Sequence, residues 1–84
     1  MRTIVICDDV EIERLLLKEI LCQYFEEINE EVSIVEYDSG ETLIADVEEG
    51  YIAMDLLFLD IQMPELSGLE FSRILNADTR VIFT

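Results

Sequence analysis

The chain contains no histidine, and its two cysteines, Cys7 and Cys22, do not form a Cys-x-x-Cys spacing. Zinc sites are built mainly from these two residue types, so we do not expect zinc. Cys7 falls in an apolar run that predicts a strand, and Cys22 falls in a helical pattern. We therefore predict two buried thiols rather than a disulfide.

Basic residues are also scarce, with 5 Lys and Arg against 20 Asp and Glu, for a net charge of -15. Such a surface repels nucleic acid and anionic membranes, and it attracts divalent cations or basic partner surfaces. No stretch reaches the roughly 18 apolar residues that a membrane helix needs, and the N-terminus lacks a signal-peptide pattern. We expect a cytoplasmic protein in which these residues bind neither nucleic acid nor membrane.

The remaining composition predicts one small folded domain over residues 1–84, because 51% of the chain is hydrophobic. Apolar runs that predict strands alternate with segments of helical periodicity, and this order predicts an α/β fold with a parallel sheet covered by helices on both faces. The predicted strands cover 3–7, 32–37, 54–60 and 80–84, and the predicted helices cover 12–28, 41–49 and a segment from about 67.

Each predicted helix has its own start signal and apolar stripe. Asp9 is placed as N-cap or first-turn acid of the first helix, with Glu13 on the polar side, and Ser39 is placed as cap of the second. A capping box at Ser67 to Glu70 starts the third. The first helix should bury a wide stripe of Ile12, Leu15, Leu16, Leu17, Ile20, Leu21, Tyr24, Phe25 and Ile28, and the second should bury Leu43, Ile44 and Val47.

Carboxylates follow two of the apolar strands. Asp60 ends the run 56–59, and the pair Asp8 and Asp9 follows the first strand. In open α/β sheets ligands bind at the carboxyl edge of the strands. Three like charges at one edge repel each other unless a cation joins them, and Mg²⁺ prefers such oxygen ligands.

This edge is suited to phosphoryl chemistry. One aspartate could act as a nucleophile and form an aspartyl phosphate, and the hydroxyl of Thr84, at the end of the fourth strand, could bond a phosphate oxygen. The alternative is structural, because an aspartate after a strand is often only a helix cap. The combination of acids at two strand ends with a hydroxyl at a third favours the acidic metal site.

The quoted residues also match a family. The motifs are Ile6-Cys7-Asp8-Asp9, Leu59-Asp60-Ile61-Gln62-Met63-Pro64, Ser67-Gly68 and Phe83-Thr84. Together they resemble the receiver domain of bacterial two-component response regulators, over all 84 residues. The resemblance implies a flavodoxin-like sheet of strand order 2-1-3-4-5. The wording of the first two motifs looks most like regulators that carry a LytTR-type DNA-binding domain.

The resemblance also implies roles for individual residues. Asp60 matches the phosphoacceptor, which takes a phosphoryl group from a phosphohistidine on a sensor histidine kinase. Asp8 and Asp9 match the acidic pair that binds Mg²⁺ together with Asp60, and Gln62 matches the position whose backbone carbonyl joins them. Thr84 matches the switch hydroxyl. Pro64 and Gly68 match residues that shape the loop after the phosphoacceptor.

Two departures from the family pattern stand out. Val10 occupies a position where the family commonly has an acid. A full receiver continues with a helix, a fifth strand that supplies a phosphate-binding lysine, and a last helix, whereas the one lysine here, Lys18, lies within the first helix. The chain therefore resembles a receiver truncated after the fourth strand. We expect that strand to be an unpaired edge that promotes self-association.

Two rival functions come from other classes. A haloacid-dehalogenase-type phosphatase also uses an aspartate nucleophile, but it needs a second aspartate two residues later, where this chain has Gln62 after Asp60 and Val10 after Asp8. A degenerate receiver would act only as a protein-binding scaffold. The intact Asp8, Asp9 and Asp60 argue against the scaffold, and the missing lysine argues for it.

Overall fold

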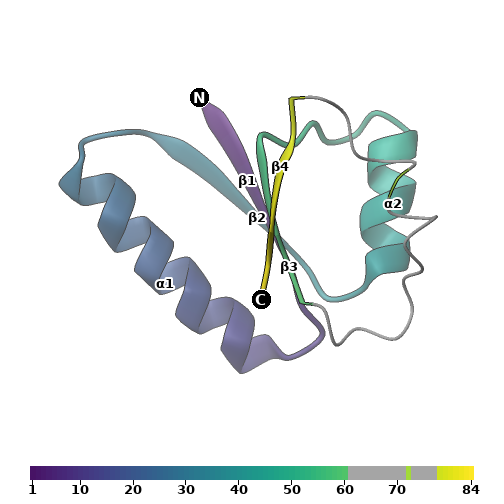
Figure 1. Ribbon diagram of the computed structural model, residues 1–84, viewed down its shortest axis with the longest axis horizontal. Coiled ribbons are helices and arrows are strands. Elements are labelled where there is room, and N and C mark those ends of the chain that lie inside the picture. Colours follow the sequence, from purple (N-terminus) through teal and green to yellow (C-terminus); the bar gives the residue numbers. More distant parts are fainter. Residues whose placement is uncertain (61–71, 73–77) are drawn as a thin grey trace.

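The computed structural model describes residues 1–60, 72 and 78–84. They form a parallel sheet with one helix on each face (Figure 1). The predicted third helix, with Pro64, Ser67 and Gly68, lies outside the described residues. The elements are β1 (Arg2–Cys7), α1 (Glu11–Glu27), β2 (Val32–Tyr37), α2 (Gly40–Glu48), β3 (Leu56–Leu59) and β4 (Arg80–Phe83).

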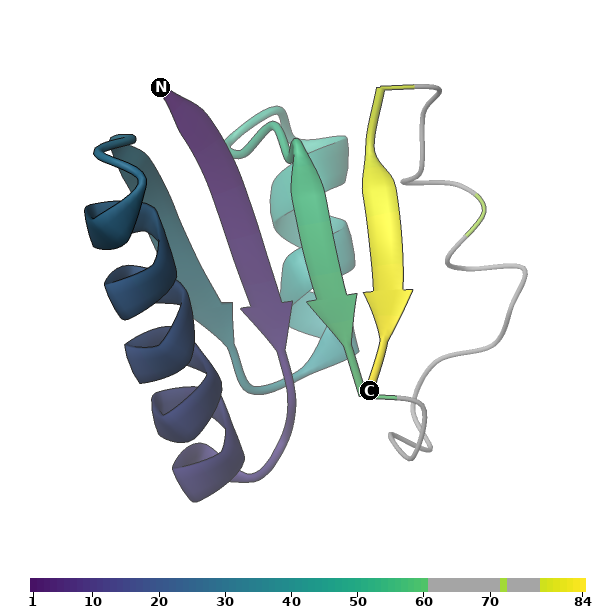
Figure 2. The ribbon, with the colours of Figure 1, turned by 60° about the vertical axis from the view of Figure 1, so that its left-hand side comes forward.

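The strand order is β2-β1-β3-β4, and every neighbouring pair is parallel. This order confirms the flavodoxin-like α/β prediction as far as the fourth strand. The register places Cys7 beside Leu59, and Leu59 beside Phe83. Because β1, β3 and β4 end level with one another, the residues that follow them meet at one edge of the sheet (Figure 2).

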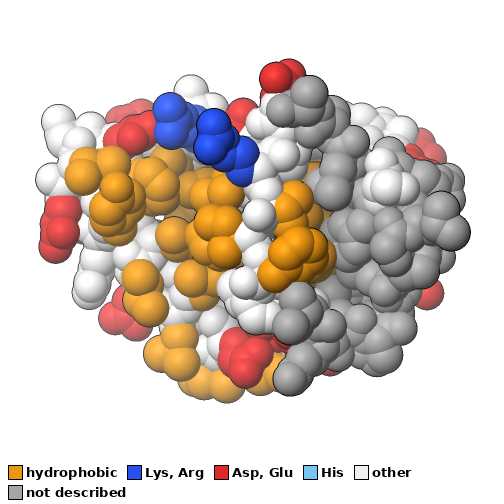
Figure 3. Space-filling view, viewed as in Figure 1, with side chains coloured by type: hydrophobic (Ala, Val, Ile, Leu, Met, Phe, Trp, Pro, Cys, Tyr) orange, Lys and Arg blue, Asp and Glu red, His pale blue; other side chains and the backbone are white. Residues whose placement is uncertain are grey.

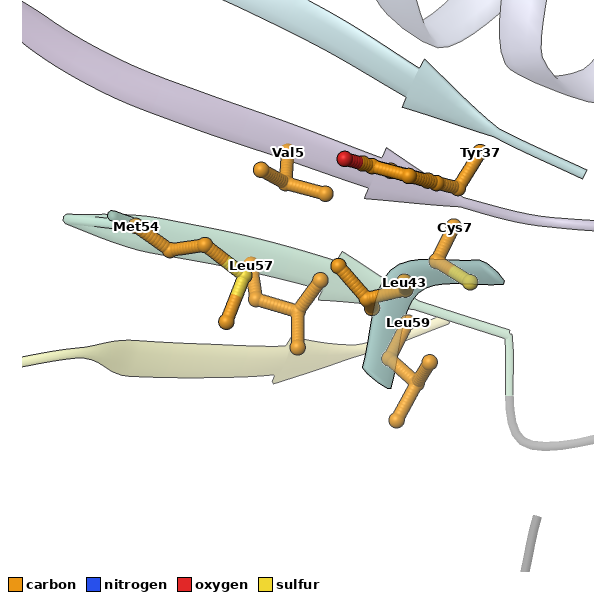
Figure 4. Close-up of a cluster of buried hydrophobic side chains, with 7 residues drawn as sticks. All are labelled: Val5, Cys7, Tyr37, Leu43, Met54, Leu57 and Leu59. Carbon is orange, nitrogen blue, oxygen red and sulfur yellow. The ribbon is translucent and has the colours of Figure 1, made fainter. Parts of the chain in front are cut away.

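The core lies on both faces of β1, as its apolar sequence predicts. Ile4 and Ile6 point toward α1, and Val5 and Cys7 belong to the cluster on the α2 side. The α2-side cluster is the larger, and Leu43 of α2 is completely buried in it. Figure 4 draws its buried members, which are Val5, Cys7, Tyr37, Leu43, Met54, Leu57 and Leu59.

The prediction for the buried stripe of α1 is largely wrong. Ile12, Leu16 and Ile20 are 61%, 54% and 62% exposed, whereas Leu21 packs on the sheet. Apolar residues occupy more than half of the circumference of this helix, so its periodicity could not show which side faces the sheet. The residues of α1 that pack on the sheet are Leu17, Leu21 and Phe25. The outward turn of the helix also exposes Cys22, so the prediction of two buried thiols holds only for Cys7.

The two helices end alike but begin differently. Asn29 and Gly50, with φ angles of 57° and 78°, follow α1 and α2 in the left-handed conformation that ends many helices. At the start of α2, the Ser39 side chain accepts a hydrogen bond from the Thr42 amide at 3.1 Å, as predicted. The N-cap of α1 is Val10, without a side-chain hydrogen bond, so the assignment of Asp9 as a cap was wrong.

Candidate functional site

The three aspartates singled out from the sequence lie together. Asp8, Asp9 and Asp60 each offer a carboxylate oxygen, and these oxygens are all within 4.8 Å of one another. Asp8 is buried, Asp60 is half-buried and Asp9 is exposed. The register explains the cluster, because Asp8 directly follows Cys7 and Asp60 directly follows Leu59 on the neighbouring strand.

Backbone and side-chain hydrogen bonds fix Asp8 in place. Its amide donates to the Tyr37 carbonyl at 3.0 Å, and its Oδ1 accepts from the Val10 amide at 2.9 Å. Its carbonyl accepts from the Arg14 guanidinium at 2.7 Å. The Asp60 amide donates to the Cys7 carbonyl at 3.1 Å, which continues the sheet ladder by one residue. Asp8 and Asp60 are therefore attached to adjacent strands at a fixed separation.

A groove of about 530 Å³ runs from the acidic cluster along α1. Thr84 lies at the same groove as Asp8 and Asp60, as expected for a hydroxyl at the end of β4. Its amide and its Oγ1 both donate to the Leu59 carbonyl, at 2.8 and 3.4 Å. The groove has an acidic end and an apolar wall, and it is lined by Asp8, Glu13, Leu16, Leu17, Ile20, Asp60 and Thr84.

Glu13 is a fourth carboxylate at this site. It is exposed, as its predicted place on the polar side of the helix implies, but its position beside Asp8 was not predicted. Its hydrogen bond with Asp8 and the negative charge of Asp8 raise the pKa of the Glu13 carboxyl above its ordinary value of 4.5, and the charges of Asp60 and Asp9 add to the effect. Glu13 lies in the first turn of α1, which starts directly after the acidic pair. This position in the first turn, directly after the acidic pair, is the sequence signal that could have placed Glu13 at the site.

The donor set of this site fits a magnesium ion. Carboxylate oxygens are hard ligands, and oxygens on opposite sides of a Mg²⁺ ion lie about 4.2 Å apart because each Mg–O bond is about 2.1 Å. The Asp8, Asp9 and Asp60 oxygens all lie within 4.8 Å of one another, so the three carboxylates are near enough to share one ion. A cation would also offset the repulsion among the carboxylates. Gln62, the remaining expected ligand, lies outside the described residues.

The described residues thus form a doubly wound α/β domain with an acidic site at the carboxyl edge of its sheet. The family model of the response regulator receiver domain matches residues 4–84. The chain therefore belongs to the response regulator receiver domain family, as its motifs predict.

One curated relative is the transcriptional regulatory protein FlgR of Helicobacter pylori, which is 29% identical over 76 residues. The match covers 90% of this chain but only 18% of FlgR. The likeness is therefore confined to a small part of that protein. In the part of the chain that the structure describes, no helix is both long enough and apolar enough to cross a membrane.

Proposed function

We propose that this domain accepts a phosphoryl group on Asp60 from the phosphohistidine of a sensor histidine kinase. The observation that carries the proposal is the clustering of the Asp8, Asp9 and Asp60 carboxylates within 4.8 Å at the end of an open groove. Asp60 is less buried than Asp8, so it is the more accessible of the two aspartates fixed to the sheet. The LytTR-type subfamily remains a prediction.

The transfer is a single displacement at phosphorus. A carboxylate oxygen of Asp60 attacks the phosphorus atom, the phosphorus–nitrogen bond of the phosphohistidine breaks, and the imidazole nitrogen keeps the electron pair and takes up a proton. Asp8, Asp9, Asp60 and the carbonyl of Gln62 would hold Mg²⁺, which when bound neutralises charge on the transferring group.

Thr84 is proposed as the switch hydroxyl of this site. Its Oγ1 donates to the Leu59 carbonyl over 3.4 Å, which is long for a hydroxyl donor. Exchanging that weak bond for one to a charged phosphate oxygen would favour the phosphorylated form. The domain would then act as a cytoplasmic signalling module whose phosphorylation shifts a two-state equilibrium. Control of transcription is proposed by analogy with the relative named above.

The mass of the intact protein after incubation with acetyl phosphate and Mg²⁺ tests the proposal. We expect the gain of one phosphoryl group, and Asp60→Asn should abolish it because an amide cannot attack phosphorus. Asp38→Asn is a control, since Asp38 is an exposed acid that also directly follows a strand but lies outside the cluster. A wild-type protein that binds Mg²⁺ but gains no mass would instead favour the scaffold function.

The phosphatase alternative is separated by turnover. The family membership favours a receiver, and the chain has Gln62 where the phosphatase needs its second aspartate. A receiver should release phosphate from acetyl phosphate only slowly, after Asp60 has been modified. Sustained, rapid release by the wild-type protein would contradict the receiver proposal.

We also propose that β4 takes part in self-association. Among the described residues β4 has β3 as its one strand neighbour, and its Ile82 and Phe83 side chains are 43% and 64% exposed. An exposed apolar edge strand is a template for pairing with a second chain. Sedimentation should show dimers that Ile82→Lys weakens. A concentration-independent monomer would contradict this proposal.

A further inference from the structure

Arg14 is a basic residue beside the acidic site. The proposed phosphoryl transfer does not use its side chain. Its side chain is only 15% exposed, although it lies on a surface helix. One guanidinium nitrogen donates to the Asp8 carbonyl at 2.7 Å, and Nε lies 3.5 Å from a carboxylate oxygen of Glu36 on β2. The planar fork of an arginine can hold two acceptors in fixed directions, which the single ammonium of a lysine cannot.

The acceptor on Asp8 is the carbonyl of the peptide bond that joins Asp8 to Asp9. A peptide unit is planar, so a strong bond to its oxygen limits rotation on both sides. The directions in which the Asp8 and Asp9 side chains leave the backbone depend on that plane. Arg14 therefore restrains both members of the acidic pair without touching either carboxylate through a described hydrogen bond.

Glu36 fixes the guanidinium in turn. Its side chain is 26% exposed, and its second carboxylate oxygen lies 3.4 Å from the Lys18 ammonium. Arg14 and Lys18 are thus neighbouring cations of α1 that share the partner Glu36, but the described bond to Asp8 comes from Arg14. This difference provides a matched pair of substitutions.

We propose that Arg14 is a positioning residue for the metal site, which it orients through the peptide bond between Asp8 and Asp9. The inference rests on the proposed Mg²⁺ site and adds a residue to it. Partners that orient the ligands of a metal typically change its affinity by about 10- to 100-fold when they are removed. Arg14→Gln and Arg14→Lys should therefore weaken Mg²⁺ binding about tenfold or more.

The sign of the effect separates positioning from simple electrostatics. Removing a positive charge beside an acidic cluster makes the local potential more negative, so charge alone would tighten Mg²⁺ binding. Positioning predicts weaker binding for Arg14→Gln. It also predicts weaker binding for Arg14→Lys, which keeps the charge but loses the fork. Lys18→Gln should leave Mg²⁺ affinity unchanged or slightly tighter.

Titration calorimetry with Mg²⁺ alone, on the full chain and the three variants, makes this measurement. Circular dichroism checks that each variant is folded. If Arg14→Gln unfolds, the Mg²⁺ affinity of Arg14→Lys tests the inference. Equal or tighter binding by a folded Arg14 variant would overturn the inference. Equal weakening by Lys18→Gln would also overturn it, because the cause would then be looser packing of α1 on β2.

A second readout needs no metal. The amide nitrogen of Asp9 belongs to the same peptide unit as the Asp8 carbonyl, so its nuclear magnetic resonance shift reports a bond to that carbonyl. In metal-free protein both Arg14 variants should move the Asp9 resonance, and Lys18→Gln should not. An unmoved resonance would overturn the inference. If the wild-type protein binds no Mg²⁺, the proposal of a metal site is contradicted. The resonance measurement then still tests whether Arg14 restrains the peptide bond between Asp8 and Asp9.

Discussion

The two helices lie on opposite faces of one sheet, and they are attached to it to very different degrees. α2 is short, begins with a side-chain cap at Ser39 and buries Leu43 completely. α1 is nearly twice as long, lacks a side-chain cap and turns much of its apolar surface outward. Figure 3 shows apolar side chains spread over α1 and the adjoining sheet. The acidic site lies where the sheet face covered by α1, the less tightly attached helix, meets the carboxyl edge of the sheet.

Helical periodicity therefore identifies a helix more reliably than it identifies the buried side. The apolar residues of α2 form one narrow stripe, and Leu43, Ile44 and Val47 all pack into the core as predicted. The apolar residues of α1 surround most of the helix, so several orientations would bury a similar area. The orientation adopted places Arg14 and Lys18 beside Glu36.

The largest expected effect tests this contrast directly. Leu43→Ala should lower the free energy of unfolding by about 2–5 kcal/mol, because it leaves a cavity in a completely buried position. Leu16→Ala is the matched control on α1 and should cost about 0.5 kcal/mol or less, as surface substitutions usually do. Urea unfolding followed by circular dichroism gives both values. A similar loss for both would show that the outer face of α1 is covered in solution.

A smaller effect concerns the acidic end of α1. The raised pKa of Glu13 means that the folded protein binds more protons than the unfolded chain above pH 4.5. Stability from this group is present at low pH and is lost as pH rises through the folded-state pKa. Glu13→Gln should therefore raise the melting temperature of the metal-free protein by a few degrees at most at pH 7, and by nothing measurable near pH 4.

Glu11→Gln is the control for that substitution, because it removes the same charge from the same turn of α1. The melting temperature should then be followed by calorimetry from pH 4 to pH 8 for both variants. If Glu11→Gln gives the same pH profile as Glu13→Gln, the contact with Asp8 is not the cause, and relief of the overall negative charge is.

Much of the fold was predictable because its signals are local. The apolar strands, the cap at Ser39, the end of α2 at Gly50 and the parallel order all follow from short stretches of sequence. The convergence of Asp8 and Asp60 was also predictable, since both follow apolar strands and parallel strands share one carboxyl edge. Two features were not predicted. The N-cap of α1 is Val10 rather than Asp9, and Glu13 lies beside Asp8, which depends on how α1 is rotated.

The alternation of strands and helices, the receiver family and the three aspartates of the site follow from the amino-acid sequence, because they depend on residue type and spacing along the chain. Tertiary structure alone decided which side of α1 is buried. It thereby brought Glu13 to Asp8 and gave Arg14 its two partners. The physical reason is that a helix with apolar residues around most of its surface has no single preferred face. Its rotation is settled only by contacts with β1 and β2.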